Sequence, residues 1–357
     1  MPPSKGYRSY RGRGSKLKIA LAVLLVLVIL ASLTFVALTR YIAYDEDGTP
    51  FLRLPDREDA DPPPQQVPED PAVDIQIQPP EEIIPVPQRP EPLRAYSLPE
   101  EALTLAGWQE AAGTLESAPE DYDAVVYLVK DLNSGVYFDT ESETSGFVRR
   151  VEKDTTEALE TMNRSKYHTI ARLTCFHDFK TANANMEEMG LKNTGGRIFY
   201  DGEYTTWLDP AKPEARRYIR NMVLELAELG FDEILLSEFS YPTAGKLDKI
   251  AYSAEGELYE DLEAFLQELR EALADKDVRL SIELTEKAAA EGRDQEAGLR
   301  LEGAAPSVDR IYVRTTGVGA EDLREAVEAA AETVAFVPEL KSAEEILEPE
   351  RGYLLLP

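Results

Sequence analysis

The 357-residue chain carries 38 basic and 67 acidic residues, a formal net charge of −29 at pH 7. Six basic residues precede Ile19, so the rest of the chain has 32 basic and 67 acidic side chains, a net charge of −35. Because phosphate binding requires a basic face, this charge argues against a nucleic-acid partner.

The first predicted element is a membrane-spanning helix. Ile19 to Leu38 contains no charged residue, and twenty mostly apolar residues can cross about 30 Å of hydrocarbon as a helix. The preceding eighteen residues contain six Lys or Arg and no acid, which under the positive-inside rule keeps the N-terminus in the cytoplasm. We expect a basic cytoplasmic tail at 1–18, an anchor helix at 19–39, and the remainder outside the cell.

A cleavable signal peptide is the alternative, because it also has a basic start and an apolar run. Its apolar core usually spans ~7–15 residues before a small-x-small cleavage site, whereas this run is longer and ends in Leu38-Thr39-Arg40-Tyr41. The sequence favours the uncleaved anchor. An external domain with one cysteine, Cys175, must rely on an ordinary hydrophobic core, which fits a bacterial envelope.

A proline-rich segment follows the anchor. Between Asp45 and Pro92 lie thirteen of the 24 prolines, mixed with Asp, Glu and Gln, a composition that cannot form a packed core. Proline-rich chain extends by up to ~3.1 Å per residue. We therefore predict a disordered acidic linker at 40–92, which acts as a stalk through the cell wall.

Residues 93–357 suit one α/β domain in which strands alternate with helices. Helical periodicity separates most of the strands, as at 215–229, where apolar residues share one face between Pro213 and Gly230. The eight predicted strands are short apolar runs: Leu93–Leu98, Ala124–Lys130, Thr169–Phe176, Glu233–Leu236, Val278–Leu284, Val308–Val313, Thr333–Val337 and Tyr353–Leu356.

Eight buried parallel strands with helical crossovers indicate a (β/α)8 TIM-type barrel, and a doubly wound open sheet is the alternative. No Gly-x-Gly-x-x-Gly turn follows a strand, so the sequence gives no reason to expect a dinucleotide or phosphate cofactor. His168 and His177 lack the spacing of a zinc site, and we expect no metal.

In such a barrel the chemistry lies at the C-terminal ends of the strands. Glu238 and Glu283 lie at the ends of neighbouring strands and could supply the two carboxyl groups of a glycoside hydrolase, ~5–5.5 Å apart for retention or ~6.5–9.5 Å for inversion. Asp131 is a further candidate partner for Glu283. With 67 acidic residues, solvated or salt-bridged glutamates at strand ends explain the pattern equally simply.

Arg172 interrupts an apolar strand, where a buried guanidinium must have an acidic partner; Glu283 and Asp131 are the favoured partners. A structural ion pair and a substrate-binding role both explain it. Candidate sugar-binding aromatics lie in the Gly195–Trp207 loop, which could instead form its own hydrophobic cluster. The candidate substrate-binding residues are Lys130, Arg172, Asp178, Tyr200, Tyr204 and Trp207.

Several segments together resemble a family of bacterial envelope proteins described as glycoside hydrolases with amylase-like barrels. The resemblance covers about Leu93 to Pro357. Its motifs are Ile170-Ala171-Arg172-Leu173-Thr174-Cys175-Phe176-His177-Asp178, Trp207-Leu208-Asp209-Pro210, and Gly230-Phe231-Asp232-Glu233-Ile234 with Tyr241-Pro242.

The departures from that family concern charge. The family's fourth-strand aspartate falls on Ser237, its arginine on Ser240, and its second-strand aspartate on Leu128. Serine cannot replace a carboxylate nucleophile. Glu238 lies one position along, and strand alternation turns it to the opposite face unless a bulge intervenes.

The sequence therefore predicts a single-pass, membrane-anchored protein with an extracellular glycoside-hydrolase-like barrel that acts on or binds an envelope or environmental polysaccharide. In the catalytic version Glu283 is the general acid, and Glu238 or Asp131 is its partner. The rival is a catalytically inactive barrel that binds glycan or protein.

Overall fold

The computed structural model describes residues 42–44, 50–52, 88–98, 122–150, 155–164 and 166–357. The chain divides into two compact units, Met1–Glu82 and Ile83–Pro357. In the first unit, β1 (Ile42–Tyr44) and β2 (Pro50–Leu52) form an antiparallel ribbon. The predicted anchor at Ile19–Leu38 and most of the predicted linker lie outside the described residues. Within the described part of the chain, no helix is long and apolar enough to span a membrane.

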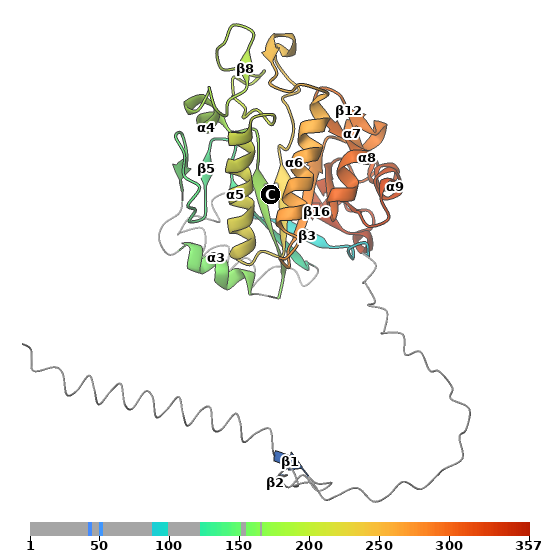
Figure 1. The fold of residues 1–357 in the computed structure, drawn as a ribbon. Coiled ribbons are helices and arrows are strands. Elements are labelled where there is room, and N and C mark those ends of the chain that lie inside the picture. Colours follow the sequence, from blue (N-terminus) through green and yellow to red (C-terminus); the bar gives the residue numbers. More distant parts are fainter. Residues whose placement is uncertain (1–41, 45–49, 53–87, 99–121, 151–154, 165) are drawn as a thin grey trace, which may run out of the picture. The chain divides into compact units, whose positions relative to one another are not determined.

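The second unit is built around a closed barrel of eight parallel strands (Figure 1). Each strand pairs in parallel with its neighbours, and the last pairs with the first, so the ring closes. All eight predicted strands are confirmed, and closure excludes the open doubly wound sheet. In order they are β3 (Arg94–Ser97), β4 (Ala124–Lys130), β7 (His168–Thr174), β9 (Glu233–Ser237), β11 (Arg279–Leu284), β14 (Arg310–Arg314), β15 (Ala335–Leu340) and β16 (Tyr353–Leu355).

Several short strands lie outside the ring of eight. β5 (Gly135–Val136) pairs antiparallel with β4 and in parallel with β6 (Val148–Arg149). Two separate antiparallel ribbons follow, β8 (Lys192–Asn193) with β10 (Ile250–Ala251) and β12 (Arg293–Asp294) with β13 (Leu299–Arg300).

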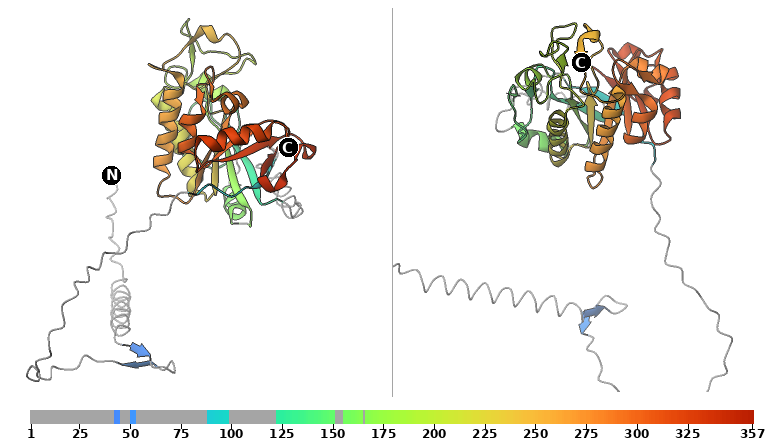
Figure 2. Two further views of the ribbon diagram at one scale, coloured as in Figure 1. Left: turned by 90° about the vertical axis from the view of Figure 1, so that its right-hand side faces the viewer. Right: turned by 45° about the horizontal axis from the view of Figure 1, so that its top comes forward.

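The helices lie outside the strands (Figures 1 and 2). Within α5 the residues predicted to share one face are buried, Pro213 opens the helix, and Gly230 follows it at φ +87°. The α-helices are α3 (Thr155–Asn163), α4 (Phe179–Ala184), α5 (Pro213–Glu228), α6 (Leu258–Ala272), α7 (Glu286–Glu291), α8 (Leu301–Ala304) and α9 (Ala320–Ala330). Single 3-10 turns are η2 (Leu247–Lys249), η3 (Ala305–Ser307), η4 (Ala343–Glu345) and η5 (Pro349–Arg351).

The strands separate two hydrophobic clusters. Alternate residues pack outward against the helices, such as Val125, Ile234 and Ile311, whereas Val126 and Leu235 belong to a smaller inner cluster. Side chains at the inner positions therefore fill the barrel. The residues at the C-terminal ends of the strands decide which side chains solvent can reach there.

A polar cluster closes the N-terminal end of the barrel. Glu233 is fully buried, and its carboxylate accepts hydrogen bonds from Ser281 (2.6 Å) and the Tyr312 hydroxyl (2.8 Å) and pairs with Arg310 and His168. Burial raises the pKa of Glu233, but the charge of Arg310 and the hydrogen bond from His168 outweigh burial and lower it to about 2. At this end of a barrel such a network stabilises the fold.

Candidate functional site

Two adjoining hollows occupy the C-terminal end of the barrel, and Arg314 lines both. The larger, about 480 Å³, is bounded by residues that include Leu128, Arg172 and Lys341, and we call it the mouth hollow. The smaller, about 140 Å³, is bounded by residues that include Glu238, Glu283 and Ser240, and we call it the glutamate pocket. The two principal carboxylate candidates therefore border one pocket.

An ion cluster supports Glu283 from inside the barrel. The Arg172 guanidinium donates a hydrogen bond to Glu283 at 2.7 Å and another to Glu339 at 3.2 Å. Arg314 lies 3.6 Å from Glu283 and 3.8 Å from Glu339. The expected pairing of Arg172 with Glu283 is confirmed. Asp131 takes no part, and Glu339 is a partner that the sequence interpretation missed.

Glu339 differs from Glu283 in its exposure and protonation. Its side chain is fully buried, whereas that of Glu283 is 17% exposed. Burial, reinforced by the negative charge of Glu283, raises the pKa of Glu339 to about 7, although Arg172 opposes the shift. Burial therefore favours the protonated form of Glu339, which shares Arg172 with the residue that reaches the pocket.

Glu238 faces the pocket because the backbone leaves strand geometry directly after β9. Its φ is +50°, a left-handed conformation that is uncommon for residues other than glycine. Ser237 ends the strand as a buried side chain, and strict alternation would turn Glu238 away. The expected orientation of Glu238 is therefore wrong. The left-handed residue supplies the break in alternation, and its side chain is 42% exposed at the pocket.

His177 connects Glu238 to the aromatic loop, and the sequence interpretation gave it no role. Its Nδ1 lies 3.4 Å from the Glu238 carboxylate, and its Nε2 lies 2.6 Å from the Thr205 hydroxyl. The imidazole stacks on Trp207, with ring centroids 4.2 Å apart. The Trp207 indole in turn donates to Asp201 at 2.8 Å.

Three of the candidate residues are committed to internal contacts. The ammonium group of Lys130 is fully buried, 2.8 Å from Asp178 and 2.7 Å from the Thr174 carbonyl oxygen. Asp178 is also fully buried and caps α4. The Asp131 carboxylate accepts bonds from two backbone N–H groups of its own turn and from a tyrosine hydroxyl. These side chains shape strand ends and line neither the mouth hollow nor the glutamate pocket.

The candidate aromatic residues of the Gly195–Trp207 loop also differ in exposure. Tyr200 and Tyr204 are exposed, by 45% and 81%, and border a separate hollow of about 590 Å³. Trp207 is only 6% exposed, so its indole is part of the loop's internal packing and does not offer a face to solvent.

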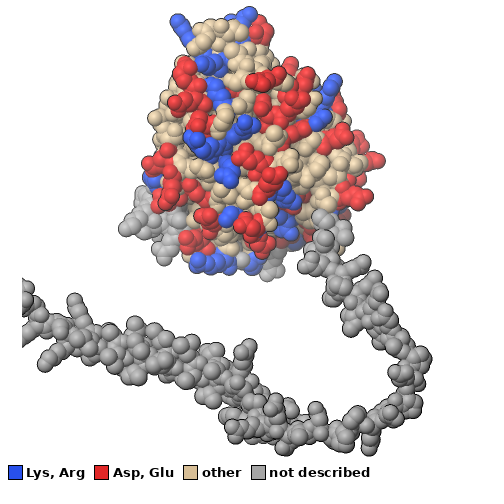
Figure 3. All heavy atoms as spheres, viewed as in Figure 1, with Lys and Arg blue, Asp and Glu red and all other residues tan. Residues whose placement is uncertain are grey.

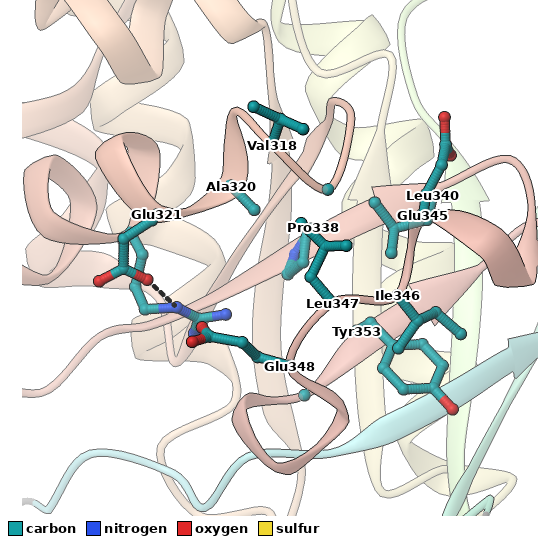
Figure 4. Close-up of a pocket in the computed structure, with 13 residues that line it drawn as sticks. Val318, Ala320, Glu321, Pro338, Leu340, Glu345, Ile346, Leu347, Glu348 and Tyr353 are labelled. Carbon is teal, nitrogen blue, oxygen red and sulfur yellow. Dashed lines mark ion pairs between the residues drawn. The ribbon is translucent and has the colours of Figure 1, made fainter.

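A further hollow of about 280 Å³ lies on the other side of β15 (Figure 4). Pro338 and Leu340 line it, and strand alternation places them opposite Glu339. Its charged side chains have partners: Glu321 lies 3.9 Å from Arg324, Glu348 lies 3.4 Å from Arg351, and Glu345 accepts from the Lys341 amide. In the described chain, no three His, Cys, Asp or Glu side chains are grouped to hold a metal ion.

Comparison with known proteins gives one family match. Residues 115–313 match the family described as "Putative glycosyl hydrolase domain". No curated protein matches the chain.

The solved structures that match include the PgaB (BpsB) glycoside hydrolase domain from Bordetella bronchiseptica. It is 16% identical, covers 75% of this chain and 94% of its own, and has a TM-score of 0.55, which shows a shared fold. A hypothetical protein from Ruminiclostridium thermocellum is 24% identical over 52% of this chain and 96% of its own, with a TM-score of 0.45. A Group IV chitinase from Ostrinia furnacalis is 14% identical over 70% and 66%, with a TM-score of 0.42.

Proposed function

This chain belongs to the family described as "Putative glycosyl hydrolase domain", and we propose that its glutamate pocket engages a polysaccharide, with hydrolysis as the leading activity. The observation that carries the proposal is that Glu238 and Glu283, from neighbouring strand ends, border one solvent-open pocket. Most glycoside hydrolases use two carboxyl groups that flank the glycosidic bond.

The two glutamates would have different roles. Glu283 donates a proton to the leaving oxygen as the carbon–oxygen bond breaks, and the carboxylate of Glu238 stabilises or activates the group that attacks the sugar carbon. Water supplies the hydroxyl group of the new reducing end. Burial and the charge of Glu283 raise the pKa of Glu339 in the adjoining cluster, which supports an acid function on this side of the pocket.

His177 is a positioning residue in this scheme. The imidazole is largely buried between Trp207 and the Glu238 carboxylate, so its position is fixed by the stacked indole and the Thr205 hydroxyl. A fixed neighbour on one side of Glu238 restricts the rotamers of that glutamate, and pre-organised carboxylates are what catalysis requires.

The alternative function is a glycan- or protein-binding barrel without turnover. It is favoured by the three positions where the resembled family carries charge, because Leu128 and Ser240 border the hollows and Ser237 is buried at the end of β9. In addition, both Arg172 and Arg314 contact Glu283. Neutralisation of the Glu283 carboxylate by two arginines would oppose a catalytic role of this residue more than a role in binding.

The test is a screen of the full-length chain against cell-wall and storage polysaccharides, with reducing-end release and binding measured together. Hydrolysis that disappears in Glu283→Gln and in Glu238→Gln, but survives in Glu325→Gln on the exposed face of α9, supports the enzyme. Glycan binding without release in the parent protein favours the alternative, and neither binding nor release would contradict both hydrolysis and glycan binding.

We also propose that Ile19–Leu38 anchors the chain in a bacterial membrane, with Met1–Lys18 in the cytoplasm and the barrel outside. The charge asymmetry around the apolar run supports this placement. Protease added to intact cells without their wall should cut between Asp45 and Pro92 and release the barrel. Complete protection of the barrel would contradict the orientation.

A further inference from the structure

The hollow beside the aromatic loop combines exposed rings with ammonium groups. Its volume is about 590 Å³, and its lining includes Tyr200, Tyr204, Asn193, Thr194, Lys246 and Lys249. The rings come from one loop and the lysines from another, which contains η2. Aromatic faces suit the apolar faces of sugars, and amide, hydroxyl and ammonium groups suit their polar substituents.

Both loops are held in fixed conformations. The Asp201 carboxylate accepts hydrogen bonds from the amides of Glu203 and Thr205 and from the Thr205 hydroxyl, and this holds Tyr204 in a left-handed conformation at φ +60°. Such a conformation is costly for a bulky residue and is found mainly where the surroundings enforce it. The backbone of Tyr204 is therefore strained, and its ring is 81% exposed.

A close backbone contact joins the two loops. Gly245 has φ +99°, and a Cβ atom there would lie 2.9 Å from the Asp201 carbonyl carbon and 3.0 Å from the Gly202 nitrogen. A larger residue could not fit without moving one loop away from the other. The hollow is thus a pre-formed feature of the fold, which reduces the entropy lost when a ligand binds.

The same residues connect the hollow to the glutamate pocket. Asp201 lines the hollow and accepts from the Trp207 indole, Trp207 stacks on His177, and His177 lies 3.4 Å from Glu238. These contacts place the hollow beside the loops that follow β7 and β9, and the inference below rests on the proposed binding of a polysaccharide at the glutamate pocket.

The charge of the two loops differs from that of the whole molecule. Residues 192–205 and 244–249 carry four basic and three acidic side chains, a net charge of +1 in a chain of net charge −29. One of those acids, Asp201, is largely buried and hydrogen-bonded. Lys249 pairs with Asp248 at 2.9 Å, whereas Lys246 has no ion pair among the described residues. Figure 3 shows basic side chains at the upper end of the molecule, the region where Figure 1 labels β8.

We propose that this hollow is a remote subsite that binds an acidic sugar of the polysaccharide engaged at the glutamate pocket. Tyr204 and Tyr200 stack on sugar rings, and Lys246 and Lys249 pair with a carboxylate or sulfate substituent. The net negative charge elsewhere does not prevent this, because ionic strength near 0.15 M screens charges beyond about 8 Å.

The test compares polymers that differ in charge but share a backbone. Retention of the full-length chain is measured in gels that contain polygalacturonate or its methyl ester, and dextran sulfate or dextran. The uronate pair and the sulfate pair distinguish the two sources of charge. We expect tighter retention by at least one charged polymer than by its neutral partner. Lys246→Gln combined with Lys249→Gln should reduce that preference by up to about fivefold for each lysine, since an exposed ion pair contributes a factor of up to about five.

The matched control combines Lys276→Gln and Arg279→Gln, which remove the same charge from a hollow at the opposite end of the barrel. It should retain the preference, and Tyr204→Ala should weaken retention by charged and neutral polymers alike. The proposal is overturned if no charged polymer is preferred, or if the preference survives loss of Lys246 and Lys249 or disappears in the control. Charge preference without reducing-end release would support the subsite and contradict hydrolysis. Release without charge preference would support hydrolysis and contradict the subsite.

Discussion

Arg172 is the residue on which the ion cluster at the barrel mouth depends. Its guanidinium contacts Glu283 at 2.7 Å and the fully buried Glu339 at 3.2 Å. We expect Arg172→Met to lower the free energy of unfolding by about 3–5 kcal/mol, because both acids lose their buried partner. Arg314→Met is the control. Its side chain is 55% exposed and farther from both acids, so it should cost less than about 1 kcal/mol. Urea unfolding of both variants measures the difference, and equal costs would contradict the assigned roles.

Glu339 makes stability depend on pH in a direction opposite to that of most carboxyl groups. Its pKa rises from 4.5 in the unfolded chain to about 7 in the fold, so the folded state binds the proton more tightly. The stabilisation is fully present below pH 4.5 and is lost as pH rises through 7. The free energy of unfolding should therefore fall further between pH 5 and pH 8 in the parent protein than in Glu339→Gln. An unchanged fall in that variant would show that Glu339 is already ionised at pH 5.

At the level of elements, the order and number of strands could be predicted, whereas their last residues could not. Apolar runs identify eight strands because both faces of a parallel barrel strand are buried. The seventh run was predicted to end at Val337, before Pro338, which lacks the N–H of a central strand residue. β15 continues to Leu340 and thereby places Glu339 in the barrel. Glu339 is a charged residue next to an apolar run, and Arg172 is one within an apolar run. This pattern was the signal that could have placed Glu339 in the barrel.

Irregular backbone accounts for the other misplaced residues. The register of β4 against β7 shifts between Leu128 and Lys130, which leaves Leu128 at the mouth hollow and buries the Lys130 ammonium group. Glu238 departs from alternation through a positive φ. Neither feature follows from strand periodicity, because each depends on one residue whose conformation is set by tertiary contacts.

The conformation of Glu238 can be tested through its backbone. Glycine adopts positive φ without the steric cost of a Cβ atom, which is about 1–2 kcal/mol for other residues. We expect Glu238→Gly to be more stable than Glu238→Ala by about 1 kcal/mol in urea unfolding. At an ordinary strand position the order is reversed, since glycine there is less stable than alanine. Finding alanine the more stable would place Glu238 in regular strand geometry, facing away from the glutamate pocket.

At the scale of the whole molecule, the barrel unit should fold without the proline-rich segment. Arg89 pairs with Glu328 at 2.8 Å, and the Glu91 carbonyl accepts from Arg310 at 3.1 Å, so among the described residues the contacts that hold the barrel's N-terminal segment begin at Arg89. A fragment that starts at Gln88 should melt at the same temperature as one that starts at Asp45. A fragment that starts at Pro92 should melt lower. A drop of many degrees already at Gln88 would show that the segment packs on the barrel.

Amide hydrogen exchange of the full-length chain tests most directly whether a sugar chain occupies the glutamate pocket, whether or not the bond is cleaved. The polysaccharide that the screen retains is added, and protection is mapped by peptide. We expect protection at 238–240, which follow β9, and at 284–286, which begin at the last residue of β11, because both segments border the pocket. Protection confined to 318–347, the segment that contains α9 and β15 and borders the hollow on the other side of β15, would contradict binding in the pocket, as would no protection at the barrel mouth despite binding.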